Sequence, residues 1–308
     1  MLNNINKLIR FAHIINPVKV NQSSDLYKSQ PITFASVLAA KSQTKSNCDV
    51  NLYTTQYEED KEIIPNGFIM LSNLTRSVLD INPTLNGKKL PLIADIFHKL
   101  NESSDFDYCI YTNSDIALMP YFYDVVHQYV LNGHDAIVIN RRRLQKNYGN
   151  ETSLDMMYAD LGKSHPGFDC FVIKKDLLNK LILGNICVGI PFFEVTLLHN
   201  LFSFAKNPLF IPDAHLTFHI GLDVMPKRDE KYYWHNRHEF FKRIHPHLKP
   251  YFSIKKFPYA ALPFYQRALK WALNPSLFTK NYIELEGKNV KAKLKYVLDE
   301  IRWKILQK

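Results

Sequence analysis

Glycine is scarce in this chain, with 10 residues in 308. Neither a G-x-G-x-x-G nor a G-x-x-x-x-G-K-[ST] motif occurs. Those motifs need glycine because the backbone must turn tightly and approach the phosphates of a nucleotide closely. The sequence therefore argues against a dinucleotide-binding enzyme and against a P-loop enzyme.

Cysteine and long apolar runs are also few. The four cysteines show neither a C-x-x-C pair nor metal-ligand spacing, which argues against disulfides. No run of about 18 apolar residues occurs, so no membrane-spanning helix is expected. Arg10 and His13 interrupt the first apolar stretch too early for a signal peptide. We therefore expect a cytoplasmic protein.

Positive charge is concentrated near the end of the chain. The net charge is +10, but residues 226–308 carry 19 Lys or Arg against 7 Asp or Glu, so the remainder is close to neutral. We expect one large α/β domain over residues 1–225, followed by a basic, aromatic and mainly helical extension over residues 226–308. Such an extension fits an anionic membrane surface, an anionic acceptor or nucleic acid, and charge alone does not choose among them.

A short apolar segment before a carboxylate is the most informative feature of the chain. Residues 108–112, YCIYT, predict a strand buried on both faces. Asn113 and Ser114 break this strand with turn-forming side chains, which leaves Asp115 at its C-terminal end. Ligands gather at the carboxyl ends of strands in open α/β sheets, and these side chains offer oxygen donors for a hard divalent cation. The alternative is that Ser114 or Asp115 caps a helix beginning near Pro120.

Strand and helix patterns surround this segment and predict an α/β fold. We expect strands at Phe11–Ile15, Asp49–Thr54, Phe68–Leu71, Ala136–Ile139, Gly167–Ile173 and Leu216–Phe218. We expect helices at residues 33–45, Leu92–Leu100, Tyr121–Leu131 and Val188–Phe202. Asn140–Arg143 are expected to end one strand, and residues 153–165 to form an irregular connection.

Six segments resemble the GT-A nucleotide-sugar glycosyltransferases, and more narrowly the glycosyltransferase-like proteins of bacterial surface-polysaccharide gene clusters. They run from His13 to Gly221 and read HIINPVK, QPITFASV, YTNSDIAL, GFDCFVI, VGIPFFEVTLL and LTFHIG. YTNSDIAL resembles the strand and Asp-x-Asp element of the family, with Asn113 in place of the first Asp. The resemblance implies a GT-A-like α/β fold, with a mixed, mainly parallel sheet flanked by helices. It says little about the extension.

The resemblance also implies a donor, a cofactor and their ligands. The donor is a nucleotide-diphosphate sugar, and Mn²⁺ or Mg²⁺ bridges its phosphates. Asp115 matches the metal-binding carboxylate, and His219 matches a late histidine that completes the metal shell. Asn113 and Ser114 belong to the same donor site, and Arg141 is a candidate for the phosphates. From the residues alone, an exposed arginine loop and a buried structural histidine remain alternatives.

Two further carboxylates are candidates for catalysis. Glu194 lies in the first turn of an expected helix, where it is either the base that takes a proton from the acceptor or a partner of the helix dipole. Asp169 precedes an apolar strand in the segment that shapes the acceptor pocket of GT-A enzymes. A structural Asp that satisfies loop amides is the alternative.

These expectations describe a metal-dependent glycosyltransferase of cell-surface polysaccharide synthesis that acts on a saccharide or lipid-linked acceptor. The basic extension adds the inner face of the cytoplasmic membrane as an expected partner. One rival is a GT-A-like saccharide-binding or assembly protein without catalysis, motivated by Asn113. A nucleic-acid-binding protein is a further rival that rests only on the basic tail, and we expect no nucleic-acid partner.

Overall fold

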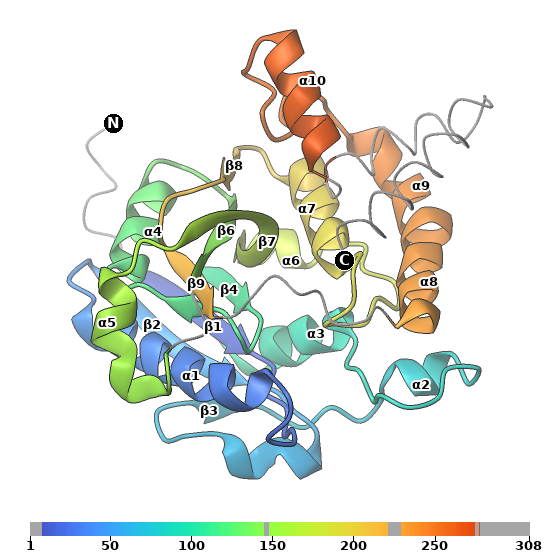
Figure 1. Cartoon of the computed structure of the whole chain (residues 1–308). Coiled ribbons are helices and arrows are strands. Elements are labelled where there is room, and N and C mark those ends of the chain that lie inside the picture. Colours follow the sequence, from blue (N-terminus) through green and yellow to red (C-terminus); the bar gives the residue numbers. More distant parts are fainter. Residues whose placement is uncertain (1–7, 145–147, 221–228, 275–276, 278–308) are drawn as a thin grey trace.

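Nine strands form one sheet in the part of the chain that the structure describes (Figure 1). The structure is a computed structural model that describes residues 8–144, 148–220, 229–274 and 277. The spatial order is β3-β2-β1-β4-β7-β6-β9-β5, and β8 pairs with β6. The strands are β1 (Ile9–Ile15), β2 (Cys48–Thr54), β3 (Ile69–Met70), β4 (Tyr108–Thr112), β5 (Ala117–Leu118), β6 (Ala136–Leu144), β7 (Lys163–Lys174), β8 (Pro208–Ile211) and β9 (Thr217–Ile220).

The sheet is mixed and mainly parallel, as the sequence predicts. Strands β1, β2, β3 and β4 pair in parallel, and β6 pairs in parallel with β8 and β9. Strand β7 is antiparallel to both β4 and β6, and β5 is antiparallel to β9. Strand β7 begins before its pairing with β4, so its first residues extend beyond the C-terminal end of β4. Strands β6 and β9 lie next to this part of the sheet.

Helices cover both faces of this sheet, which confirms the predicted α/β class. They are α1 (Leu26–Gln43), α2 (Val78–Ile81), α3 (Ile93–Ser103), α4 (Phe122–Leu131), α5 (Leu154–Ala159), α6 (Lys175–Leu178), α7 (Phe193–Phe204), α8 (Glu230–His238), α9 (His245–Leu248) and α10 (Phe264–Leu273). Tighter turns are η1 (Glu58–Ile63), η2 (Glu151–Ser153) and η4 (Lys249–Tyr251), and η3 (Glu239–Ile244) is a π-helix. Strand β4 shows the two-sided burial: Cys109 and Tyr111 pack with α3 and α7, whereas Tyr108 and Ile110 pack with α1 and α4.

The described chain after β9 packs onto α7. The ring of Phe240 lies 5.4 Å from that of His199, and the ring of Phe257 lies 6.0 Å from that of Phe202. The domain boundary predicted at residue 225 falls within residues 221–228, outside the described residues, and stays a prediction. No helix among the described residues is long and apolar enough to cross a membrane.

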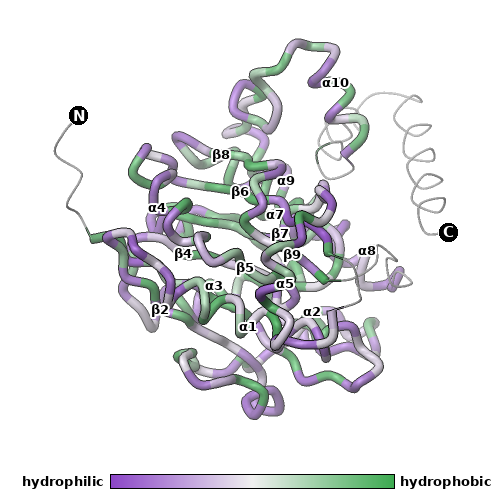
Figure 2. The backbone as a smooth tube through the Cα atoms, turned by 60° about the vertical axis from the view of Figure 1, so that its left-hand side comes forward, coloured by the Kyte–Doolittle hydropathy of each residue, from purple (hydrophilic) through white to green (hydrophobic). Residues whose placement is uncertain are grey.

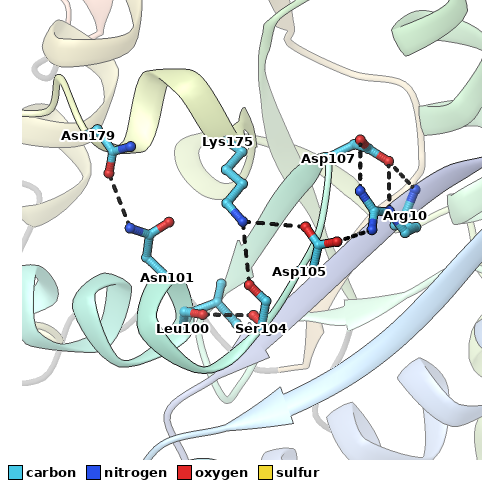
Figure 3. Close-up of polar contacts among 8 residues, drawn as sticks. All are labelled: Arg10, Leu100, Asn101, Ser104, Asp105, Asp107, Lys175 and Asn179. Carbon is cyan, nitrogen blue, oxygen red and sulfur yellow. Dashed lines mark hydrogen bonds and ion pairs between the residues drawn. The ribbon is translucent and has the colours of Figure 1, made fainter.

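A network of ion pairs joins strand ends at the edge of the sheet opposite to Asp115 (Figure 3). The backbone N–H of Arg10 donates to Asp107 at 2.9 Å, and its guanidinium pairs with Asp107 and Asp105. Lys175 lies 3.6 Å from Asp105 and donates to the carbonyl of Ser104. These surface contacts connect the starts of β1 and β4 to the end of β7, and each contributes little stability alone.

Several segments differ from the predicted elements. Strand β6 continues through Arg141–Arg143, and β7 begins before the predicted residue, because these two polar segments pair with each other. The β6 segment also pairs with β9, so the backbone groups are satisfied. Helix α5 replaces part of the predicted irregular connection because Met157 packs with Phe218 in a small apolar cluster. Helix α1 begins earlier than predicted and contains Pro31.

Candidate functional site

Asp115 lies in a tight turn between β4 and β5. The N–H of Ile116 donates to the carbonyl of Asn113 at 3.2 Å, which closes the turn. The hydroxyl of Tyr111 donates to Oδ1 of Asn113 at 3.2 Å, and Ser114 is buried. The turn therefore holds the Asp115 carboxylate at the C-terminal end of β4, where the sequence predicts it.

The helix after this turn does not use it as a cap. Helix α4 begins at Phe122 with Tyr121 at its N-terminal cap position, and that cap makes no side-chain hydrogen bond. Strand β5 lies between the turn and the helix. The interpretation of Ser114 or Asp115 as the cap of this helix is therefore wrong.

His219 of β9 is the partner of Asp115. Its Nε2 lies 3.2 Å from Oδ2 of Asp115, and the two side chains are 18% and 27% exposed. Burial by itself raises the pKa of Asp115, but the hydrogen bond and charge of His219, together with the charge of Arg141, hold this pKa below its usual range. Asp115 is therefore a carboxylate at neutral pH.

His215 lies outside β9 and does not share a strand face with His219. His215 precedes β9, its φ is 47°, and its carbonyl accepts a hydrogen bond from Tyr121 at 2.8 Å. Burial lowers the pKa of His215, and the charge of Arg142 lowers it further. Of the two histidines, only His219 lies beside Asp115.

Arg141 of β6 forms an ion pair with Asp169 of β7. Asp169 is 6% exposed, and its Oδ2 has no hydrogen-bond partner among the described residues. Burial raises the pKa of Asp169, Arg141 opposes the rise, and the charge of Asp115 adds to it. The hydrogen-bond partner of Asp169 is thus a guanidinium rather than a loop amide, and its second oxygen is a buried acceptor without a partner among the described residues.

The structure adds His165 to this site. The N–H of Gly167 donates to Nδ1 of His165 at 2.9 Å. Burial, followed by the charges of Arg141 and Arg143, lowers the pKa of His165 to about 3. The ring is therefore neutral, with its proton on Nε2 as a donor. A β-carbon at Gly167 would lie 2.8 Å from this ring and 3.2 Å from Oδ2 of Asp169, so glycine leaves room for both side chains.

Strand periodicity is the signal that would have identified these extra residues. Side chains alternate between the two faces of a strand, so Arg141 and Arg143 share one face of β6. Arg143 lies opposite His219 in the register of β6 and β9. Burial lowers the pKa of Arg143, and the like charge of Arg141 lowers it further. Arg142 faces the other way and pairs with Asp213.

Glu194 lies in the first turn of α7, beside the same cluster. Its pKa is raised to about 7, first by burial and then by the negative charge of Asp169, against the backbone hydrogen bond and the charge of Arg141. A carboxyl group with a pKa near neutrality exchanges protons readily at that pH. Asp169 and Arg141 thus couple Glu194 electrostatically to the groups around Asp115.

Asn236 of α8 fastens the segment that leads to Glu194. It has no exposed surface, and its Oδ1 accepts from the N–H of Cys187 at 2.9 Å. Its Nδ2 donates to the carbonyl of Cys187 at 2.9 Å and to those of Ile190 and Pro191 at 3.3 Å. One side chain therefore holds several backbone groups just before α7.

Phe192, two residues before Glu194, has a strained backbone. Its φ is 77°, in the left-handed region that bulky residues rarely adopt. Its ring lies 5.5 to 5.7 Å from the rings of Tyr233, Phe240 and Phe241. Such strain persists where packing over-determines the conformation, and here the packing comes from α8 and the π-helix.

The side chains around Asp115 fit a divalent cation bound together with phosphates. No group of three His, Cys, Asp or Glu with metal-site geometry occurs among the described residues. Mg²⁺ in nucleotide sites is usually held by one or two carboxylates plus the substrate phosphates, and Mn²⁺ also accepts imidazole. Asp115 and His219 supply one carboxylate and one imidazole, and the unpartnered Oδ2 of Asp169 is a further oxygen in the cluster.

The structure thus gathers the candidate residues at the C-terminal end of β4. Seven side chains from five elements or turns form one cluster, in which neighbouring members interact electrostatically. They are Asp115, Arg141, Arg143, His165, Asp169, Glu194 and His219. Five of these were candidates from the sequence, and Arg143 and His165 were not. A site with paired carboxylates, guanidinium groups and a neutral imidazole can bind an anion and move a proton beside it.

No protein-family model and no curated protein matches the chain. Among solved structures, it is similar to glucosyl-3-phosphoglycerate synthase from Mycobacterium tuberculosis in complex with Mn²⁺, UDP-glucose and phosphoglyceric acid, with 13% identity and a TM-score of 0.41 over 76% of this chain and 78% of that one. It is also similar to S. aureus TarS, residues 1–349, in complex with UDP-GlcNAc, with 12% identity and a TM-score of 0.42 over 90% of both chains. These likenesses are distant, and the function proposed below rests on the residues of this chain.

Proposed function

We propose that the protein is a glycosyltransferase that moves a sugar from a nucleotide-diphosphate donor to a saccharide or lipid-linked acceptor. The observation that carries the proposal is the cluster around Asp115, at the end of the strand whose sequence resembles the metal-binding element of GT-A enzymes. The order of Asp115, Asp169, Glu194 and His219 along the chain also agrees with that resemblance.

The donor diphosphate is bound by positive charge and hydrogen-bond donors in this cluster. Arg141 and Arg143 lie on one face of β6 and repel each other, and an anion between them relieves that repulsion. The neutral ring of His165 offers Nε2–H as a donor. Asp115 and His219 would hold Mn²⁺ or Mg²⁺, and Asn113 and Ser114 shape the turn around Asp115. When bound, the cation neutralises the negative charge of the departing diphosphate.

Glu194 is the base that takes the proton from the acceptor hydroxyl. Its pKa of about 7 allows it to accept that proton near neutral pH, and the ordered segment before α7 fixes its position. Asp169 orients a hydroxyl of the acceptor with its free Oδ2. This assignment corresponds to transfer with inversion at the anomeric carbon.

We place this reaction in cell-surface polysaccharide synthesis at the cytoplasmic side of the membrane. The narrower sequence resemblance, spread over six segments, supports that pathway. The charge of residues 226–308 supports an anionic surface as a partner.

Release of nucleoside diphosphate from UDP-, GDP- and CDP-sugars tests the proposal. We expect one donor to be turned over in the presence of Mn²⁺ or Mg²⁺, and Asp115→Asn to abolish that turnover. Asp213→Asn is the matched control, since Asp213 pairs with Arg142 on the other face of β6. Turnover that is unchanged in Asp115→Asn, or equally lost in the control, would contradict the assignment.

One observation favours a second candidate, a saccharide-binding protein without catalysis. Asn113 replaces the first Asp of the family element, and its Oδ1 accepts a hydrogen bond from Tyr111. If a nucleotide or saccharide binds but no tested donor releases its diphosphate, this second function replaces the first.

A further inference from the structure

Exposed apolar side chains are concentrated in one region of the described chain. Six of the fourteen large apolar side chains that are exposed lie between Tyr251 and Leu273. Four of them belong to α10: Phe264 is 75% exposed, Tyr265 70%, Leu269 59% and Leu273 55%. Tyr265, Leu269 and Leu273 are spaced by four residues, so they form a stripe along the helix.

The opposite side of α10 is anchored to the protein. Trp271 is 8% exposed, its Nε1 donates to the carbonyl of Pro258 at 2.8 Å, and its ring lies 6.2 Å from that of Phe257. Asn274 donates to the carbonyl of Pro166 at 3.1 Å. Phe257 and Trp271 therefore form the internal packing of this segment.

Charge accompanies the exposed stripe. Residues 249–274 contain five Lys or Arg and no Asp or Glu. Lys255 and Lys256 are exposed in the segment before α10, and Arg267 and Lys270 lie on the helix itself. Figures 1 and 2 show α10 projecting from the top of the molecule, and Figure 2 shows both hydrophobic and hydrophilic residues along it. Apolar side chains at the tip of a positive segment match the interface of an anionic bilayer.

We propose that the outer face of α10, formed by Phe264, Tyr265, Leu269 and Leu273, docks the protein on an anionic lipid surface. The aromatic and leucine side chains enter the interface, and the exposed Lys255 and Lys270 contact the headgroups. Asn274 ties the helix to Pro166, next to His165 of the candidate site, so docking brings that site close to the membrane. The inference goes beyond the proposed transfer reaction and does not require it.

Vesicle co-sedimentation of the full-length protein tests the apolar part of the proposal. We expect binding to vesicles containing phosphatidylglycerol, and a fall of about tenfold or more in the partition coefficient for Leu269→Ser/Leu273→Ser. Ile69→Ser/Met70→Ser on β3 is the matched control, because these residues are 48% and 55% exposed at the other end of the molecule. Equal loss in both double variants, or no loss in the α10 variant, overturns the proposal.

Charge variants and the molecular mass complete the test. We expect the double variant Lys255→Gln/Lys270→Gln to bind anionic vesicles more weakly and with a smaller dependence on salt concentration. The control is Lys41→Gln/Lys45→Gln, which changes two exposed lysines near the end of α1 and should leave both properties unchanged. Equal binding to neutral phosphatidylcholine vesicles overturns the proposal. If the leucine variant instead converts a dimer to a monomer in light scattering with unchanged vesicle binding, a second copy of the chain is the occupant and the lipid assignment is wrong.

Discussion

Glu194→Gln should stabilise the protein at alkaline pH while removing its activity. The environment raises the pKa of Glu194 from 4.5 to about 7, because burial disfavours the charged form. Each pKa unit corresponds to about 1.4 kcal/mol, so ionised Glu194 destabilises the folded state by up to about 3 kcal/mol. Glutamine has nearly the same shape and no charge, so it removes this cost.

The pH dependence gives the effect a sign that can be checked. Between pH 4.5 and 7 the folded protein keeps a proton on Glu194 that the unfolded chain has lost. Folded protein therefore binds more protons in this window, and its free energy of unfolding falls as pH rises. The glutamine variant lacks this fall, so the difference in free energy of unfolding between variant and wild type should grow from pH 4.5 to 7 and then stay level.

Urea denaturation from pH 4.5 to 8.5 measures this difference, and donor turnover in the same buffers measures catalysis. We expect transfer by the wild type to rise with pH through about 7, and the variant to be slower by about 10²–10⁴ at pH 8. Glu151→Gln, at an exposed position, shows whether loss of any negative charge has the same effect. If the difference in free energy of unfolding does not change with pH and the variant has normal turnover, Glu194 is not the base and interacts only with the helix dipole.

Two further substitutions test how the site is supported. Gly167→Ala should lower donor turnover at least about tenfold with a small change in melting temperature, because the added methyl group displaces His165 and crowds Asp169. Unchanged turnover would show that His165 is not part of the site. Asn236→Asp keeps the Oδ1 acceptor but loses the Nδ2 donors, so we expect kcat to fall more than donor KM rises and the pH midpoint of Glu194 to shift. A loss of stability with normal kinetics in the folded fraction would make Asn236 purely structural.

The central strand and its carboxylate were predictable from the sequence because local rules and tertiary packing agree there. YCIYT has the composition of a strand covered on both faces, and β4 has the predicted bounds. Glu194 was likewise predicted in the first turn of a helix, and it lies in the first turn of α7. Asp115 comes shortly after a strongly apolar strand, and Glu194 lies at the start of a strongly apolar helix.

The rest of the site depends on pairing between segments that are distant in sequence. Arg141 and His165 lie in polar stretches that local composition assigns to loops, and only the ladder joining β6, β7 and β9 makes them strands. Asn236 contacts a segment about 45 residues earlier in the chain. No local sequence pattern predicts such a contact, so the role of Asn236 is visible only in the folded protein.

Thermal unfolding with nucleotides and metal tests the central claim most directly. Wild type and Asp115→Asn would each be melted with UDP, GDP, CDP and their sugars, with and without Mn²⁺. A ligand at 100 times its Kd stabilises the folded state by about 2.7 kcal/mol, which is measurable as a higher melting temperature. We predict that at least one nucleotide raises the wild-type melting temperature only with the metal present, and that Asp115→Asn melts like the wild type without ligand but loses this shift. If no nucleotide shifts the wild type, or if the shift survives in Asp115→Asn with unchanged Mn²⁺ dependence, the site around Asp115 is not a metal-assisted nucleotide site.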